Sequence, residues 1–284
     1  MKDDLQSAPR KPRLALMGEF SAGKSTLANL LLGRDISPVQ ATATQLPPIW
    51  YSYGEADTYR VLPDGSRETI DLENLRGATP DNTSMISISA TTSLLEACDL
   101  IDMPGTSDPN MAADYWESFL PQIDFVIWCT PATQAWRQSE AAIWELMPPH
   151  LWENSLLLIT RMDKVLSDRD KARVLQRVSR SVEGMFYDVL PIALLPALQG
   201  RDNPEVLNQT GASDLVERMV EVFERFEGEA TPDLRAVEDM PQPAPPAAQP
   251  KEVSNLGSGK IVPRRIVRDP SEKNHARPEA RSAI

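Results

Sequence analysis

The sequence predicts an α/β fold in which a mostly parallel β-sheet carries helices on both faces. Short apolar runs alternate with stretches of helical periodicity along the first 228 residues, as in a sheet built from strand–helix units. Two of these runs, at 125–129 and 156–160, are almost continuously apolar, which is typical of central strands buried on both faces. A glycine-rich loop at 18–25 joins another apolar run to a helical stretch. Together these observations favour a three-layer sandwich.

The individual elements follow in chain order. Apolar or alternating runs predict strands at 13–17, 49–53, 58–62, 68–72, 85–90, 94–101, 125–129 and 156–160. The turn sequence Pro63-Asp64-Gly65-Ser66 joins the third and fourth of them into a hairpin. Helices are expected at 24–33, 137–147, 169–189 and 213–226. The last two carry apolar stripes, which we interpret as faces packed on the core, with a membrane or partner face as the alternative.

Composition and charge exclude several kinds of function. The chain has 284 residues and a net charge of −12, whereas a nucleic-acid-binding protein needs a basic surface. Cys98 and Cys129 lie in apolar runs that predict strands, so we interpret them as buried thiols rather than a disulfide. His150 and His275 lie far apart, and no cysteine–histidine cluster has zinc spacing. We therefore expect neither a nucleic-acid partner nor a zinc site.

The amino terminus gives an expectation about location. The segment Met1-Lys2-Asp3-Asp4 is polar and does not resemble a secretory signal. No run approaches the roughly 20 apolar residues that span a bilayer. We therefore expect a cytoplasmic protein, with peripheral attachment at the inner membrane as the alternative.

Three segments differ in composition. Residues 1–12 predict a flexible amino terminus, 13–228 the folded domain, and 229–284 a proline-rich, largely disordered tail. Within the tail, residues 251–284 carry eight Lys/Arg and four Asp/Glu, a balance of +4, which leaves −12 − 4 = −16 for the rest. Such a change of sign is compatible with a tail that contacts a partner or an anionic surface. We favour a solvated tail.

The loop Gly18-Glu19-Phe20-Ser21-Ala22-Gly23-Lys24-Ser25 matches the phosphate-loop pattern G-x-x-x-x-G-K-[ST]. A chance match in a chain of this length is on the order of one per cent. Gly18 and Gly23 allow the backbone to approach phosphate, Lys24 would hold the β- and γ-phosphates, and Ser25 would ligate Mg²⁺. The predicted nucleotide contacts here are Gly18, Ser21, Ala22, Gly23, Lys24, Ser25 and Thr26. The fold class is therefore that of P-loop nucleoside triphosphatases.

A second motif, Asp102-Met103-Pro104-Gly105, follows an apolar run. Asp102 can bind Mg²⁺ through water, and the Gly105 amide can sense the γ-phosphate as a switch. Alone, D-x-x-G is also a common turn. Because this D-x-x-G follows a phosphate loop in the chain, it predicts the part of the same site that binds Mg²⁺.

A third motif, Thr160-Arg161-Met162-Asp163, follows the strand predicted at 156–160. A carboxylate at Asp163 can accept hydrogen bonds from N1–H and the N2 amino group of guanine, a pair that adenine does not offer, so this motif predicts GTP. The usual pattern is N/T-K-x-D, and Arg161 stands in place of lysine but can also stack on a base. We expect Thr160, Arg161 and Asp163 to contact the nucleotide. A plain strand-end turn is the alternative, and Ile192-Ala193-Leu194 is the candidate for a base-side loop.

The first switch should supply a threonine to Mg²⁺ from the segment 38–48. Thr44 is the prediction and Thr42 the alternate. The predicted Mg²⁺ ligands are then Ser25, Thr44 and Asp102. The residues predicted to act in hydrolysis are Lys24, Ser21 and Thr44.

With these motifs placed, the chain resembles a bacterial dynamin-like GTPase. The resemblance is strongest in GEFSAGKSTLANLLLG from Gly18 and is supported by DMPG, by TRMD, by the hairpin insert and by Trp136-Arg137-Gln138-Ser139-Glu140. It covers about 13–228. It implies a molecular switch that binds GTP, GDP and Mg²⁺ and hydrolyses GTP to GDP and phosphate. It also implies homodimers or a hetero-partner across the GTPase domain, and peripheral membrane contact through a partner.

The chain departs from that family in two ways. Dynamins carry helical stalk and bundle regions, which we do not expect in 229–284, so the resemblance does not imply membrane fission by this chain alone. Phe20 stands where eukaryotic dynamins have a glutamine that positions water, and Thr106 is not a glutamine either. Turnover is therefore expected to be slow or to depend on dimerisation. The alternatives are a nucleotide-gated adaptor with negligible turnover, which recruits a partner through its switch face or basic tail, and a P-loop ATPase or kinase.

Overall fold

The structure is a computed structural model that describes residues 10–37, 46–107 and 115–227. The predicted switch threonines, Thr42 and Thr44, lie outside the described residues, as does the tail from residue 228 onward. Along the described ranges, no helix is long and apolar enough to cross a membrane.

In the described part of the chain, one nine-stranded sheet forms the centre of the fold, in the order β4-β3-β5-β2-β6-β1-β7-β8-β9. Its strands are β1 (Arg13–Gly18), β2 (Ile49–Tyr53), β3 (Tyr59–Val61), β4 (Arg67–Thr69), β5 (Met85–Ala90), β6 (Asp99–Asp102), β7 (Phe125–Pro131), β8 (Leu156–Thr160) and β9 (Asp188–Pro191). β1 pairs in parallel with β6 and β7, and β7, β8 and β9 continue the parallel ladder. β2 is antiparallel to β6, and β3 and β4 form the predicted hairpin. The carboxyl ends of β6, β1, β7 and β8 therefore meet at one edge.

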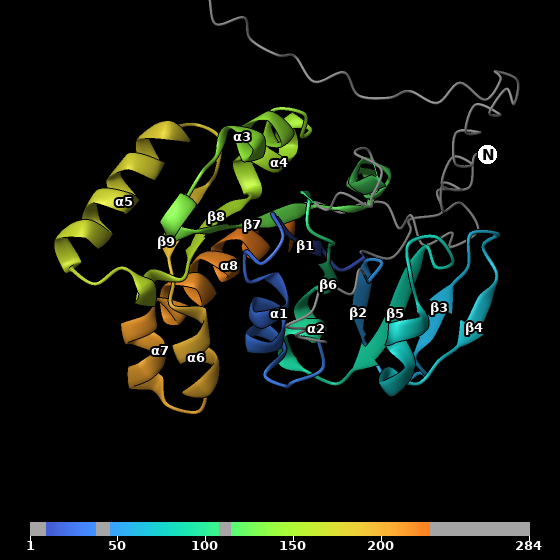
Figure 1. The fold of residues 1–284 in the computed structure, drawn as a ribbon. Helices are drawn as coiled ribbons and strands as arrows, with labels where there is room; N and C mark the ends of the chain where they lie inside the picture. The colour runs from blue at the N-terminus through green and yellow to red at the C-terminus, as the bar shows by residue number, and fades with distance from the viewer. Residues whose placement is uncertain (1–9, 38–45, 108–114, 228–284) are drawn as a thin grey trace, which may run out of the picture. The chain divides into compact units, whose positions relative to one another are not determined.

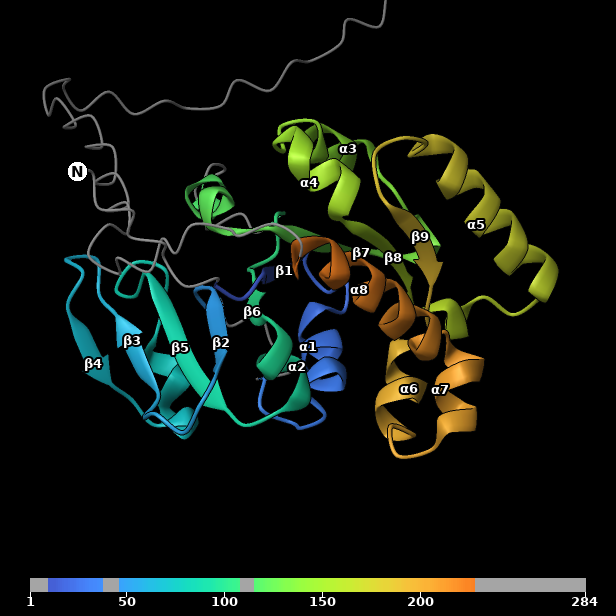
Figure 2. The same cartoon turned by 180° about the vertical axis from the view of Figure 1, so that it is seen from behind.

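Helices cover both faces of the sheet, as predicted (Figures 1 and 2). The α-helices are α1 (Lys24–Leu32), α2 (Ser93–Ala97), α3 (Gln138–Trp144), α4 (Pro149–Asn154), α5 (Asp168–Ser181), α6 (Leu194–Gln199), α7 (Pro204–Thr210) and α8 (Ala212–Glu227). Short 3₁₀ turns are η1 (Leu72–Gly77), η2 (Tyr115–Gln122), η3 (Ala132–Gln134) and η4 (Met162–Lys164).

Two hydrophobic cores lie on the two faces, because successive residues of a strand point to opposite sides. In β1, Leu14 and Leu16 pack with α1, α2, α6 and α8, whereas Ala15 and Met17 pack with α3, α4 and α5. All four side chains are fully buried. The three-layer sandwich is thus confirmed.

Several predicted elements end elsewhere than expected: the strand predicted at 68–72 stops with β4 at Thr69, and the helix predicted at 137–147 stops with α3 at Trp144. The helix predicted at 169–189 stops with α5 at Ser181, because Gly184 adopts a left-handed φ of 78° and turns the chain. Val189 then belongs to β9 rather than to the helix. The run at 94–101 is divided between α2 and β6, so Cys98 follows a helix and does not lie in a strand. Both cysteines are nevertheless free and buried, as predicted.

Candidate nucleotide-binding site

The phosphate loop lies between β1 and α1, at the carboxyl edge of the parallel strands. Gly18 has a φ of 135°, and a Cβ there would lie 2.2 Å from the carbonyl oxygen of Cys129 in β7. Gly23 has a φ of 104°, which a side chain rarely adopts. Ser21 is also left-handed at 58° and is exposed. Lys24, Ser25 and Thr26 form the first turn of α1, so their amides lie at the positive end of the helix.

The side chain of Lys24 lies inside the phosphate loop and contacts its backbone. Its ammonium donates to the carbonyl oxygens of Gly18 at 3.0 Å and Glu19 at 2.9 Å, and the residue is 8% exposed. Burial lowers the pKa of Lys24, and the negative charge of Asp102 opposes that shift. The lysine therefore places a positive charge at the centre of the loop.

Asp102 ends β6 beside this lysine and is 7% exposed. Its Oδ2 accepts a hydrogen bond from the Ser37 hydroxyl at 3.2 Å, while its Oδ1 is buried without a partner among the described residues. Burial raises the pKa of Asp102, and Lys24 and the hydroxyls of Ser25 and Ser37 oppose the shift. An orphaned carboxylate oxygen next to a serine hydroxyl suits a hard cation such as Mg²⁺.

The loop after Asp102 touches the phosphate loop directly. A Cβ on Gly105 would lie 2.8 Å from the amide nitrogen and 2.9 Å from the Cα of Phe20. The Thr106 amide donates to the Gly18 carbonyl at 3.2 Å, and the Phe20 amide donates to the Ser107 hydroxyl at 3.1 Å. The structure thus brings the second motif against the first, and only glycine fits at 105.

The third motif lies on the other side of the phosphate loop. The Thr160 hydroxyl donates to the Ala22 carbonyl at 2.7 Å, and the guanidinium of Arg161 donates to the Ser21 carbonyl. Arg161 is left-handed, with a φ of 58°, which begins the turn η4. Asp163 pairs with Lys164 at 3.2 Å, and its side chain is 22% exposed.

The candidate base-side loop joins the same assembly. The Ile192 carbonyl accepts from the Met162 amide at 3.2 Å. The Cδ1 atom of Leu194 would lie 2.9 Å from a Cβ on Gly23. Apart from Thr44, the predicted site residues therefore come from neighbouring loops at one sheet edge.

One part of the site was not predicted. Glu19, inside the phosphate loop, pairs with Arg137 at 2.6 Å and accepts from the Ser139 hydroxyl at 2.7 Å. These partners belong to the segment after β7 that carries the family resemblance. Its Glu140 is fully buried and accepts from Trp128, Thr130 and the Arg137 amide. The sequence signals were a carboxylate inside an anion-binding loop and an unassigned W-R-x-S-E stretch.

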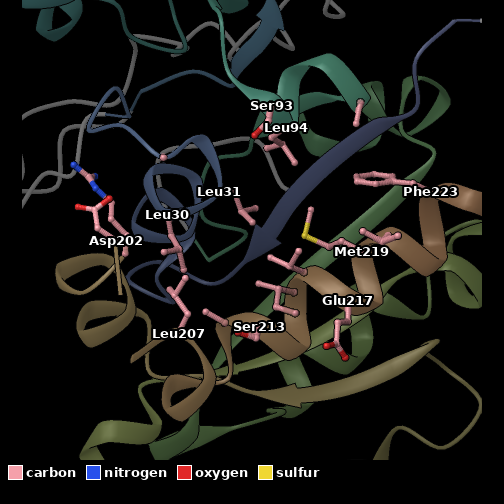
Figure 3. Close-up of a pocket in the computed structure, with 17 residues that line it drawn as sticks. Leu30, Leu31, Ser93, Leu94, Asp202, Leu207, Ser213, Glu217, Met219 and Phe223 are labelled. Atoms are coloured by element: carbon pink, nitrogen blue, oxygen red, sulfur yellow. The ribbon is translucent and has the colours of Figure 1, made fainter. Parts of the chain in front are cut away.

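An apolar pocket of about 700 Å³ lies between α1, α2, α7 and α8 (Figure 3). The apolar stripe predicted on 213–226 is only partly buried. Its buried side packs in the core through Leu215, Met219 and Val222. Val216 and Val220 line the pocket instead and are 53% and 48% exposed. The pocket contains no residue of the three motifs. It is therefore separate from the nucleotide site.

One known family matches part of the chain. A model of the Dynamin family matches residues 14–147, which include the first two motifs and end before the third. Dynamin-like protein 2 of Campylobacter jejuni is 28% identical over 174 residues, 59% of this chain and 29% of that protein. Isoniazid-induced protein IniC of Mycobacterium tuberculosis is 31% identical over 134 residues, 40% of this chain and 26% of that protein. The chain therefore spans less than a third of the length of these curated relatives.

Solved structures show the same fold. Two chains from studies of an oligomerised bacterial dynamin pair, described as a mechanism for the long-range sensing and tethering of membranes, align with a TM-score of 0.56. They are 22% and 24% identical to this chain, and each alignment covers 76% of this chain and 36% of the other.

Proposed function

We propose that the chain carries a GTPase domain of the dynamin type, which binds GTP with Mg²⁺ and hydrolyses it to GDP and phosphate as a molecular switch. The observation that carries this proposal is the meeting of three motifs at one sheet edge. The Gly18 carbonyl accepts from the amide of Thr106, which directly follows the second motif, and the Ala22 carbonyl accepts from the hydroxyl of Thr160 in the third. One loop thus links the groups suited to phosphate, to metal and to base.

Each residue has a proposed role in the reaction. Lys24 neutralises the charge that develops on the β- and γ-phosphates, and the amides of the phosphate loop hold the phosphate oxygens. Ser25, Thr44 and Asp102 would hold Mg²⁺, which would supply positive charge against the phosphates. The exposed, left-handed Ser21 is the side chain of the loop that we assign to the attacking water. Water then displaces GDP from the γ-phosphorus.

Guanine selection is assigned to the third motif. Asp163 accepts the two donors of the guanine edge, and Arg161 covers the base while its guanidinium remains tied to the Ser21 carbonyl. This contact connects base recognition with the loop that holds the phosphates. The likeness to an oligomerised dynamin pair supports pairing of GTPase domains, with a second copy or another protein, and membrane contact through that partner.

The proposal is tested by two measurements on the full chain. A fluorescent GTP analogue should bind at low micromolar concentration and be displaced by GTP and GDP but not by ATP. Phosphate release should then be followed against protein concentration, with and without liposomes. A specific activity that rises with concentration supports catalysis by paired domains. Displacement by ATP as effective as by GTP, or no binding at all, would refute the proposal.

Replacing Gly105 with alanine tests the switch assignment. The added Cβ cannot stay 2.8 Å from the Phe20 amide nitrogen, so the loop must move away from the phosphate loop. We expect the preference for a non-hydrolysable GTP analogue over GDP to fall about tenfold, the cost of one lost hydrogen bond to a charged group. Gly77→Ala is the matched control, because a Cβ there meets nothing within 4 Å. An unchanged preference in Gly105→Ala would contradict the assignment.

Phe20 favours a second candidate function. Its side chain is 55% exposed in the phosphate loop, where family resemblance places a water-positioning glutamine. A nucleotide-gated adaptor would bind GTP in the same way but release phosphate at the uncatalysed rate at every protein concentration. The concentration series above separates the two.

A further inference from the structure

We propose that Arg137 is a positioning residue that makes the phosphate loop competent for a triphosphate by neutralising Glu19. The inference rests on the proposed function and names a determinant of triphosphate affinity within it. Arg137 lies outside the three motifs, in the segment after β7.

Glu19 conflicts with the function of its loop. It is the second residue of a loop whose amides and lysine are suited to an anion, and its side chain is only 9% exposed. Its own carbonyl oxygen accepts from the Lys24 ammonium at 2.9 Å, so this residue is adjacent to the charge that would hold phosphate. An unpaired carboxylate here would repel phosphate and would also be costly to bury.

Each carboxylate oxygen of Glu19 has a separate donor. Oε2 accepts from Arg137 at 2.6 Å, and Oε1 accepts from the Ser139 hydroxyl at 2.7 Å. Of these two donors only the arginine carries a charge, so it is the one that offsets the negative charge of the Glu19 carboxylate. Its side chain is 43% exposed, which places the pair at the rim of the site rather than in the core.

Hydrogen bonds to buried side chains fix the backbone around Arg137. Its amide donates to the buried Glu140 at 2.9 Å, and Glu140 also accepts from the Trp128 indole and the Thr130 hydroxyl of β7. The preceding Trp136 has a left-handed φ of 60° and donates from its amide to the Thr130 hydroxyl. A non-glycine residue keeps this conformation only where surrounding contacts impose it. These contacts fix the point from which the arginine reaches Glu19.

The expected consequence depends on the charge of the nucleotide. In Arg137→Met the apolar stem is kept while Glu19 becomes an unpaired anion next to the phosphates. Repulsion grows with phosphate charge, so the Kd for GTP should rise about 10- to 100-fold and the Kd for GDP clearly less. Added salt should reduce the difference between variant and wild type. A purely structural role would weaken both nucleotides equally.

The decisive experiment is a double-mutant cycle on the full chain, with GTP analogue and GDP titrated into wild type, Arg137→Met, Glu19→Gln and the double variant. Recovery of most of the lost GTP affinity in the double variant supports the proposal. Arg173→Met, on the exposed face of α5, is the control for loss of an arginine. A double variant as weak as Arg137→Met, or equal losses for GTP and GDP, would overturn it.

Two further outcomes keep the test decisive. If Arg137→Met does not fold, Glu19→Gln alone provides the test. It must raise the affinity for GTP relative to GDP, because Arg137 then adds an unpaired positive charge. An unchanged ratio of the two affinities overturns the proposal. A wild-type chain that binds no GTP refutes the proposed function. A wild-type chain that binds GTP with no charge-dependent effect of Arg137 refutes only this inference.

Discussion

Lys24→Ala is expected to abolish GTP binding at low micromolar nucleotide and, with it, phosphate release. The ammonium is the charge at the centre of the loop, and removing one partner of a buried charged contact costs about 2–5 kcal/mol, or roughly 30- to 4,000-fold in Kd. Titration of a fluorescent GTP analogue measures the loss directly. Lys171→Ala is the control, because that lysine lies on α5 in an exposed pair with Asp168.

The same substitution should leave the nucleotide-free fold intact. Burial lowers the pKa of Lys24, which means that the folded state disfavours the charged ammonium. The alanine variant is destabilised by the loss of two hydrogen bonds to carbonyls, and it is stabilised because no ammonium has to be buried. We expect a change in unfolding free energy below about 1 kcal/mol, or roughly 2–4 °C in Tm. A folded variant that still binds GTP with wild-type affinity would refute the assignment of the phosphate loop.

Asp163→Asn is expected to change base specificity rather than remove binding. An amide offers one acceptor and one donor, whereas the guanine edge presents two donors, so one contact becomes a clash of donors. We expect GTP affinity to fall about 100-fold or more, as when a site loses one of a pair of buried polar contacts. Xanthine presents a donor at N1 and an acceptor at C2, which match the amide. Xanthosine triphosphate should therefore become the preferred ligand.

Competition between the two nucleotides for one fluorescent probe measures this exchange. The variant also loses the pair with Lys164, but an exposed pair contributes little to stability. Asp168→Asn is the matched control, because its side chain is 97% exposed at the start of α5. If Asp163→Asn keeps its preference for GTP, or loses both nucleotides while remaining folded, the third motif does not read the base.

Much of the site could be predicted because its motifs follow strands. Gly18, Asp102 and Thr160 each end an apolar run, and the carboxyl ends of neighbouring parallel strands meet at one edge whatever their order. The steric need for glycine at 105 was not predicted. Its amide was assigned to phosphate, but the closeness of Phe20, which excludes any Cβ, depends on two loops that approach each other in space.

Other features depend on contacts between distant residues. Trp128, Trp136 and Trp144 belong to different elements, yet Trp128 lies 6.3 Å from Trp136 and 5.7 Å from Trp144, measured between ring centroids. Because these tryptophans fall on different elements, their regular spacing of eight could not indicate that they meet. The Glu19–Arg137 pair could not be predicted from the sequence either. Its residues are 118 positions apart, and they meet because β1 and β7 are neighbours in the sheet.

By itself the sequence determined the fold class and predicted a phosphate loop and motifs for metal and base, because periodicity and glycine placement act over a few residues. Only the tertiary structure decided where α5 ends, which valines of α8 remain exposed, and which arginine pairs with Glu19. Those features depend on which elements pack together, and the order of strands in a sheet is not written in any local pattern. The loop that indicated a nucleotide thus also contained a carboxylate whose partner only the fold could supply.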